Sequence, residues 1–356
     1  MTLHIRRDVP LASFTTLEIG GPARYFLEAS NEETLVAGIR WALRHDAPVH
    51  LLGAGSNLVV GDGGVEGLVI RLTSPGFSWG REICGRTIVT AAAGHSWDDL
   101  VAAVTAAGLA GLECLSGIPG TVGAAPVQNV GAYGQEAADT ILSVRVLDLT
   151  TLEPENLPAG ECAFGYRDSL FRREPGRYAV LGVTFGLRTG GAPTLLYPEL
   201  ASAVGDGSVG LQEVRETVLG MRRRKSMLLD PRDENRRSVG SFFTNPMVSG
   251  DAAADLAARI DTDAGPTASP LPRYVAEDGQ VKLSAAWLIE RAGFARGLRR
   301  GRVGISTRHT LALVNLGGGT AAELLALAAE IRGGVLEQFG VALRMEPVCV
   351  GCVPPW

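Results

Sequence analysis

Lysine is nearly absent from this chain. Of its 33 basic residues only Lys225 and Lys282 are lysines, and the others are arginines. An ammonium group is a compact charge on a flexible stem, whereas a guanidinium is a planar fork. An isolated lysine therefore either marks a place where a compact charge is needed or reflects chance. Lys225 directly follows three arginines, 222–224, near the end of an expected helix. This cluster is either an anion-binding site or a solvated helix end favoured by the helix dipole.

Cysteines and long apolar segments are also scarce. Five cysteines are scattered over 356 residues, too few for a disulfide framework. Cys349 and Cys352 form one CxxC pair, but a structural zinc site needs further ligands, so we expect no metal. No stretch of about 18 apolar residues is present, and the first residues lack the apolar core of a signal peptide.

The charge balance narrows the possible partners. A net charge of −5 gives no indication of a basic surface for nucleic acid. Hydrophobic content of 46% and charged content of 20% are typical of a globular enzyme. We therefore expect a cytoplasmic protein that contacts neither nucleic acid nor a membrane.

The length allows two or three domains. Residues 31–45 predict an amphipathic helix with Asn31 as N-cap, between strand-like runs at 23–29 and 48–53. This β-α-β unit indicates a mixed α/β first half, and a second compositional unit begins near Leu211. Further strands are predicted at 67–72, 87–94, 141–149, 178–187 and 310–316, and further helices at 96–110, 212–227, 284–293 and 320–339.

Two glycine-rich segments are suited to binding a ligand. The segment 115–135, LSGIPGTVGAAPVQNVGAYGQ, has five glycines, two prolines and no charged residue. Such a backbone can turn sharply and expose N–H groups, which suits a pyrophosphate or a flat ring system. GAGSN, 53–57, follows a predicted strand, where α/β folds often bind phosphate, but it lacks the spacing of a dinucleotide or P-loop motif. The alternative for the longer segment is a purely structural Gly/Pro-rich loop.

Two further segments could carry chemistry. In GSFFTNP, 240–246, the hydroxyl of Ser241 lies between a glycine and two phenylalanines, where it could donate a proton or only cap a turn. The motif is not the GxSxG of a hydrolase. In FGYRDS, 164–169, Tyr166 and Arg167 offer an aromatic face and a guanidinium that binds carboxylates bidentately.

Together these segments resemble the UDP-N-acetylenolpyruvoylglucosamine reductase family. The resemblance covers nearly the whole chain, and five motifs occur in the family's order. They are LGAGSNL (52–58), IPGTVGAAPVQNVGAYGQE (118–136), FGYRDSLF (164–171), GSFFTNP (240–246) and DGQVKLSAAWLIE (278–290).

The resemblance implies an α+β fold, a mixed α/β arrangement: an FAD-binding fold of the vanillyl-alcohol-oxidase type with a separate α+β substrate-binding domain. It implies FAD-binding subdomains at 1–70 and 71–208, the second joined by the C-terminal strand 343–356, and a substrate-binding domain at 209–342. It also implies FAD as cofactor, NADPH as hydride donor, and reduction of UDP-N-acetylglucosamine enolpyruvate to UDP-N-acetylmuramate.

The family's functional residues map onto this sequence by motif. The catalytic set is expected at Arg167, Ser241 and Glu346. The cofactor-binding set is expected at Gly53, Gly55, Ser56, Asn57, Gly120, Gly123, Gln128, Asn129, Gly131 and Tyr133. The substrate-binding set is expected at Tyr166, Tyr197, Arg222, Lys225, Asn245, Tyr274 and His309, and Tyr197 indicates the subclass whose tyrosine-bearing loop folds over substrate.

Two alternatives remain. One is another FAD-linked oxidoreductase of the same superfamily, such as a sugar or alcohol oxidase; His95 and Cys114 lie near the flavin loops, but no motif indicates a covalent flavin link. The other is a non-catalytic flavin or nucleotide-sugar sensor. A sensor is expected to lack Ser241 or Glu346, and both residues are present.

Overall fold

The computed structural model describes residues 3–205, 209–264, 270–275 and 279–356. The chain forms two compact units. Unit 1 comprises Met1–Pro10, Pro22–Ser56 and Val65–Leu229, and unit 2 comprises Leu11–Gly21, Asn57–Gly64 and Asp230–Trp356. The three predicted functional domains stay a prediction, because compactness alone does not establish which segment binds which ligand.

The first sheet of unit 1 contains the predicted β-α-β unit. Its strand order is β1-β2-β5-β3, with β1 antiparallel to β2 and the other pairs parallel. The helix begins as predicted, because the Asn31 side chain accepts a hydrogen bond from the Thr34 N–H at 2.8 Å. The elements are β1 (Arg6–Pro10), β2 (Pro22–Ala29), α1 (Glu32–Arg44), β3 (Val49–Leu52) and β5 (Val65–Leu72).

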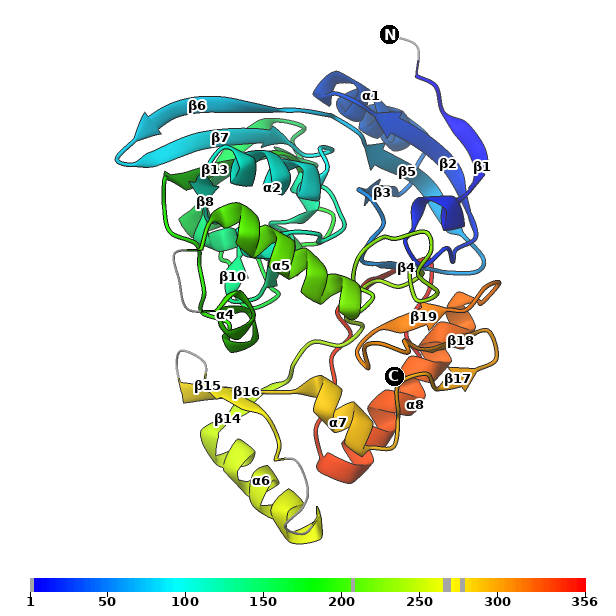
Figure 1. Cartoon of the computed structure of the whole chain (residues 1–356). Helices are drawn as coiled ribbons and strands as arrows, with labels where there is room; N and C mark the ends of the chain where they lie inside the picture. The colour runs from blue at the N-terminus through cyan, green and yellow to red at the C-terminus, as the bar shows by residue number, and fades with distance from the viewer. Residues whose placement is uncertain (1–2, 206–208, 265–269, 276–278) are drawn as a thin grey trace. The chain divides into compact units, whose positions relative to one another are not determined.

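The second sheet of unit 1 is antiparallel. Its order is β12-β11-β13-β7-β6, and β8 pairs with β13. The β6–β7 hairpin extends from this sheet as a long arm, drawn in cyan in Figure 1. The strands are β6 (Phe77–Ile83), β7 (Arg86–Ala92), β8 (Leu109–Ala110), β11 (Ile141–Asp148), β12 (Pro154–Pro158) and β13 (Tyr178–Thr189), and a small hairpin joins β9 (Gly131–Ala132) to β10 (Gln135–Glu136).

Helix α2 packs against the second sheet of unit 1. The predicted helix at 96–110 is shorter in the structure, where α2 ends at Ala106. Gly108 has φ +74°, which lies in the left-handed region and breaks the helix before β8. Trp97 of α2 is buried and packs edge to face against Phe185 of β13, with the two ring centroids 6.1 Å apart. The helices are α2 (Trp97–Ala106), α3 (Leu170–Arg173), α4 (Pro198–Val204) and α5 (Leu211–Arg224).

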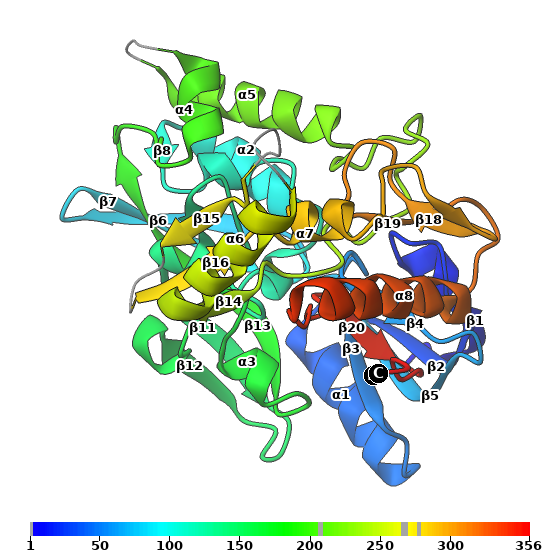
Figure 2. The ribbon, with the colours of Figure 1, turned by 90° about the horizontal axis from the view of Figure 1, so that it is seen from below.

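The described residues of unit 2 form three small sheets and three α-helices around an apolar core. Two antiparallel sheets have the orders β14-β16-β15 and β17-β18-β19, and β20 pairs parallel with β4. Figure 2 shows α6 next to the first of these sheets. The elements are β4 (Leu58–Val60), β14 (Met247–Ser249), α6 (Gly250–Ala264), β15 (Arg273–Val275), β16 (Gln280–Leu283), α7 (Ala285–Arg291), β17 (Arg299–Arg300), β18 (Val303–Ile305), β19 (Leu313–Asn315), α8 (Ala321–Phe339) and β20 (Val348–Val350).

The long helix α8 matches its prediction closely. Thr320 and Glu323 form a reciprocal capping box at its start, and Gly340, with φ +70°, ends it. Its apolar face packs into the core with Phe242 and Phe243, which are almost completely buried. Within the described residues no helix is long and apolar enough to cross a membrane.

Candidate functional site

The two predicted cofactor loops lie side by side in unit 1. The Ser56 hydroxyl donates a hydrogen bond to the Pro119 carbonyl at 3.0 Å. A Cβ at Gly53 would lie 2.8 Å from the Thr121 hydroxyl oxygen, so this approach requires glycine. Gly120 has φ +145°, another conformation that favours glycine. The glycines therefore bring the two loops together.

Free backbone donors make this pair of loops suitable for an anion. Among the residues that the structure describes, no group accepts a hydrogen bond from the N–H groups of residues 53–56 or of Gly120. Successive unpaired N–H groups on a glycine-rich turn are typical of pyrophosphate sites. The residues present thus fit the pyrophosphate of FAD. The Gly123 N–H is not available to a ligand, because it donates a hydrogen bond to the Ala93 carbonyl at 2.8 Å. A Cβ at Gly123 would meet the Ala93 side chain.

Three predicted site residues have left-handed backbone conformations. Asn129, Tyr133 and Arg167 have φ values of 45°, 49° and 53°. Non-glycine residues adopt this region at a cost, and such residues cluster at functional sites. The Asn129 side chain is buried and bound by protein groups: its amide donates to Glu136 at 2.6 Å and to the Gly165 carbonyl at 3.1 Å. It ties the glycine-rich loop to the segment that carries Arg167.

Arg167 lies directly against the glycine-rich loop. Its guanidinium donates to the Gly131 carbonyl at 2.6 Å and to the Asn129 carbonyl at 3.3 Å, and it stacks 5.4 Å from the Tyr166 ring centroid. Gln128, also on this loop, accepts a hydrogen bond from Arg172 at 3.1 Å. The structure therefore brings the predicted Arg167 to the predicted cofactor loop.

The basic cluster at the end of α5, residues 222–225, contacts other residues of unit 1. Lys225 Nζ lies 2.9 Å from a Glu199 carboxylate oxygen and 6.0 Å from the Tyr133 ring centroid. Tyr133 and Tyr197 meet edge to face at 5.5 Å. Arg222 Nη2 donates to the Met227 carbonyl at 2.8 Å, whereas its buried Nε has no partner among the described residues. Burial lowers the pKa of Arg222 and raises the pKa of the Tyr133 phenol.

Sequence reasoning missed a buried carboxylate that supports this cluster. Glu113 is fully buried and accepts hydrogen bonds from the N–H of Gly111 at 2.7 Å, the amide of Gln135 at 2.8 Å and the N–H of Thr194 at 2.8 Å. It joins the start of the glycine-rich segment to the segment that leads to Tyr197. The sequence gives no signal for this role, because its partners are far apart along the chain.

A second missed carboxylate, Asp98, connects three elements of unit 1. It accepts two hydrogen bonds from Arg215, at 2.6 and 2.9 Å, and one from the Gly117 N–H at 2.6 Å. Burial alone would raise the pKa of Asp98, but the hydrogen bonds from Arg215 and Gly117 outweigh it and hold that pKa below its usual value. Asp98 thereby fixes α2, α5 and the glycine-rich loop to one another.

In unit 2 the structure brings Ser241 and Glu346 onto neighbouring segments. The Glu346 N–H donates to the Phe242 carbonyl at 2.9 Å, and the Thr244 N–H donates to the Arg344 carbonyl at 3.0 Å. The buried Phe242 and Phe243 hold the serine segment in the core. Within the described part of the chain, the Ser241 hydroxyl has no hydrogen-bond partner.

Asn57 lies next to Glu346 in unit 2. Its carbonyl accepts a hydrogen bond from the Val348 N–H at 3.0 Å, and its amide donates to the Glu346 carbonyl at 3.4 Å. This contact follows from the parallel pairing of β4 with β20. A predicted cofactor residue and a predicted catalytic residue, 289 positions apart, thus lie together.

The remaining predicted substrate residues of unit 2 are held by different elements. The Asn245 side chain accepts a hydrogen bond from the Ala285 N–H at 3.0 Å, at the start of α7. Tyr274 of β15 is 47% exposed and lies 5.9 Å below the Lys282 ammonium. The His309 N–H donates to the Ser306 hydroxyl at 3.3 Å.

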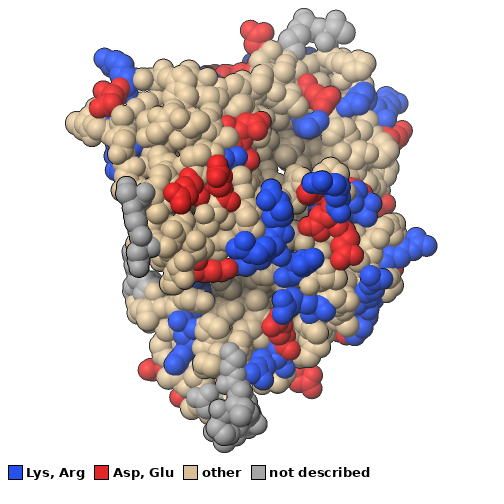
Figure 3. Space-filling model, in the orientation of Figure 1, with Lys and Arg blue, Asp and Glu red and all other residues tan. Residues whose placement is uncertain are grey.

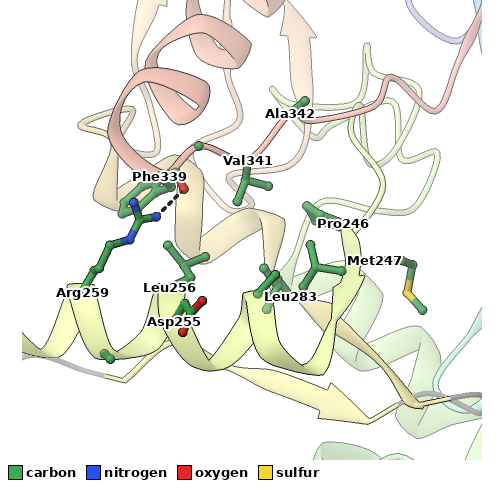
Figure 4. Close-up of a pocket in the computed structure, with 13 residues that line it drawn as sticks. Pro246, Met247, Asp255, Leu256, Arg259, Leu283, Phe339, Val341 and Ala342 are labelled. Carbon is green, nitrogen blue, oxygen red and sulfur yellow. Dashed lines mark hydrogen bonds between the residues drawn. The ribbon is translucent and has the colours of Figure 1, made fainter.

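A cavity of about 910 Å³ lies elsewhere in unit 2. Figure 4 shows it between α6 and the segment that follows α8, with Arg259 donating a hydrogen bond to the Phe339 carbonyl at one end. Its walls are mostly apolar and include no predicted site residue, although Pro246 follows Asn245. This cavity is therefore not the predicted active site.

Charged side chains of both signs lie on the surface of the molecule. Figure 3 shows Lys and Arg side chains, in blue, and Asp and Glu side chains, in red, on the face drawn there. In the described ranges no group of three or more His, Cys, Asp or Glu side chains could hold a metal ion. Burial and the neighbouring Cys352 raise the pKa of Cys349 to about 12, so this thiol stays protonated near neutral pH.

Comparisons with known proteins identify the family to which this chain is related. The family model "FAD binding domain" matches residues 23–151, and "UDP-N-acetylenolpyruvoylglucosamine reductase, C-terminal domain" matches residues 230–350. UDP-N-acetylenolpyruvoylglucosamine reductases of Thermobifida fusca and Mycobacterium tuberculosis are 48% and 44% identical, covering 99% and 98% of this chain and 99% and 96% of theirs.

A solved structure has a similar fold over nearly the whole chain. The crystal structure of UDP-N-acetylenolpyruvylglucosamine reductase from Thermus caldophilus has a TM-score of 0.65 and 27% identity, over 98% of this chain and 99% of that one. The fold is thus that of an FAD-binding protein with a second α+β part, which confirms the predicted fold class. The chain belongs to the UDP-N-acetylenolpyruvoylglucosamine reductase family.

Proposed function

We propose that this chain reduces UDP-N-acetylglucosamine enolpyruvate to UDP-N-acetylmuramate, with NADPH as hydride donor and FAD as cofactor, in the synthesis of peptidoglycan precursors. The observation that carries the proposal is the placement of Ser241 and Glu346, far apart in sequence, on hydrogen-bonded segments of unit 2. Full-length similarity to reductases of this name supports it.

FAD would be held by the paired loops of unit 1. The unpaired N–H groups of residues 53–56 and of Gly120 would bind its pyrophosphate. When bound, FAD supplies hydride transfer from NADPH to the enolpyruvyl double bond. The chain's own residues bind the substrate, stabilise the charge that develops and deliver a proton.

Arg167 is assigned to the substrate carboxylate. A guanidinium binds a carboxylate with two parallel hydrogen bonds, and this one is already oriented by the Gly131 and Asn129 carbonyls. Charge that builds up on the carbon beside the carboxylate spreads into that carboxylate, so a fixed donor there lowers the barrier. Glu346, if protonated, would donate a hydrogen bond to the same developing charge.

Ser241 is assigned as the proton donor. The reduced double bond needs one hydride and one proton, and the proton goes to the carbon next to the carboxylate. The Ser241 hydroxyl has no partner among the described residues, so it is available to the substrate. After donation the alkoxide must recover a proton from solvent.

Arg222 and Lys225 are assigned to the diphosphate of the substrate. The buried Arg222 Nε without a partner and the neighbouring ammonium offer donors to an anion beside Tyr133. Tyr197, in edge-to-face contact with Tyr133, supports the tyrosine-loop subclass. We assign Tyr166, Asn245, Tyr274 and His309 to the rest of the substrate, and we expect a cytoplasmic monomer.

Stopped-flow absorbance of the flavin-loaded protein under anaerobic conditions tests the function. NADPH should bleach the flavin band, and UDP-N-acetylglucosamine enolpyruvate added second should restore it. Bleaching without recovery would favour another FAD-linked oxidoreductase. Binding of flavin and nucleotide sugar with neither change would indicate a sensor.

A further inference from the structure

The ion pair between Lys225 and Glu199 covers a group that the proposed function assigns to the substrate. The two charged atoms are 2.9 Å apart, with 33% of the lysine and 49% of the glutamate side chain exposed. Glu199 lies in the first turn of α4, two residues after Tyr197. In this structure a carboxylate oxygen therefore lies where an anionic ligand oxygen would meet Lys225.

The surroundings of this pair are rich in positive charge. Arg222 and Arg224 both act electrostatically on Tyr133, and Glu199 is the acidic residue that acts on the same phenol. Arg222 also keeps a buried Nε without a partner among the described residues. Asp98 also acts electrostatically on Arg222, but it is already paired with Arg215. Glu199 therefore faces an excess of positive charge, which an anion with two or more charges would balance.

The backbone that carries Glu199 is firmly held. Leu200 of α4 is fully buried against Val214, Val218 and Met221 of α5. At the other end of the segment, the buried Glu113 binds the Thr194 N–H. Because both ends are fixed while the Glu199 side chain is half-exposed, the carboxylate can leave Lys225 by side-chain rotation alone.

We propose that Glu199 competes with the substrate diphosphate for Lys225 and thereby sets the affinity of this site for its substrate. This inference rests on the proposed function. A diphosphate contributes more negative charge than one carboxylate and displaces Glu199, whereas a singly charged ligand competes poorly. Displacing Glu199 costs the same free energy for any anion that takes its place, so Glu199 lowers the affinity of every anion at Lys225 by the same factor.

Binding of UDP-N-acetylglucosamine enolpyruvate to the flavin-loaded protein, measured by calorimetry, tests the inference. Exposed ion pairs contribute about 0.2–1 kcal/mol, so Glu199→Gln should bind this ligand up to about five-fold more tightly than the unaltered protein. Glu216→Gln, which removes the same charge from the exposed face of α5, should bind like the unaltered protein. Added salt should shrink the Glu199→Gln effect.

The double variant Glu199→Gln with Lys225→Ala separates competition from a general charge effect. If Glu199 acts through Lys225, Glu199→Gln should change affinity little in the Lys225→Ala background. An equal gain in that background, or no gain in the single variant, would overturn the inference alone. Failure of the unaltered protein to bind the enolpyruvyl sugar would instead contradict the proposed function, and the inference with it.

Discussion

In unit 1 the candidate side chains Arg167 and Lys225 are bound by other protein groups, whereas in unit 2 the Ser241 hydroxyl has no partner among the residues that the structure describes. Arg167 is held by two carbonyls, Lys225 by Glu199, and both lie in a framework fixed by Glu113 and Asp98. Ser241 is placed by the backbone bonds of its neighbours and by two buried phenylalanines. We propose a division of labour between two of these residues, in which Lys225 of unit 1 sets the affinity for substrate and Ser241 of unit 2 supplies the proton.

The largest expected effect is on the framework of unit 1. Glu113→Ala would leave the N–H groups of Gly111 and Thr194 buried without an acceptor, at about 1–3 kcal/mol each. We expect a loss of about 3 kcal/mol in the free energy of unfolding, measured by urea denaturation. Glu161→Ala, at an exposed position, is the control. Equal stability of the two variants would show that the network does not hold unit 1.

The next effect concerns chemistry in unit 2. Ser241→Ala should leave flavin reduction by NADPH unchanged and slow flavin reoxidation by the enolpyruvyl sugar by at least about 100-fold, because a positioned proton donor contributes that much. Rapid mixing resolves the two half-reactions. Ser249→Ala, a serine that caps α6, serves as control. Similar slowing of both half-reactions would show that Ser241 has a structural role and is not the proton donor.

A smaller effect is expected at the basic cluster of unit 1. Lys225→Ala removes a charge-assisted contact with the diphosphate and should weaken substrate binding by about ten-fold, with FAD affinity unchanged. Arg223→Ala removes an exposed charge from the same helix end and is the matched control. Calorimetric titration with the enolpyruvyl sugar measures both. If Lys225→Ala bound the enolpyruvyl sugar as tightly as the unaltered protein does, Lys225 would not be a ligand of the diphosphate.

The smallest effect depends on pH. Folding lowers the Asp98 pKa, so its carboxylate stabilises unit 1 fully above the unfolded-state pKa of about 3.9, and this stabilisation disappears as the pH falls through the lower folded-state pKa. Asp98→Asn should therefore cost about 1 kcal/mol of stability at pH 7. Thermal unfolding of both proteins from pH 7 to pH 3 should show the two curves converge. A difference that stays constant would assign the effect to packing.

Local signals allowed much of the fold to be predicted from sequence. Asn31 and the Thr320–Glu323 box start α1 and α8 where expected, because a cap involves residues within one turn. The β6–β7 hairpin was only half predicted and α6 not at all. The helix expected to reach Ala110 stops at Ala106 because Gly108 takes a left-handed conformation.

The candidate site was likewise only partly predictable from the sequence. Glycine-rich motifs indicated the two loops, and the resemblance to the reductase family indicated Lys225. Glu113, Asp98 and Glu199 gave no signal, because each acts through groups 19 to 117 positions away in the chain. The assignment of 11–21 and 57–64 to unit 2 likewise depends on contacts between distant segments.

The most direct test of the division of labour compares Ser241→Ala and Lys225→Ala in one experiment. Flavin reoxidation is followed after rapid mixing with increasing concentrations of the enolpyruvyl sugar, which gives a limiting rate and a half-saturation concentration for each variant. The account predicts that Ser241→Ala lowers only the limiting rate and that Lys225→Ala raises only the half-saturation concentration. A fall in the limiting rate of Lys225→Ala as large as that of Ser241→Ala would contradict it.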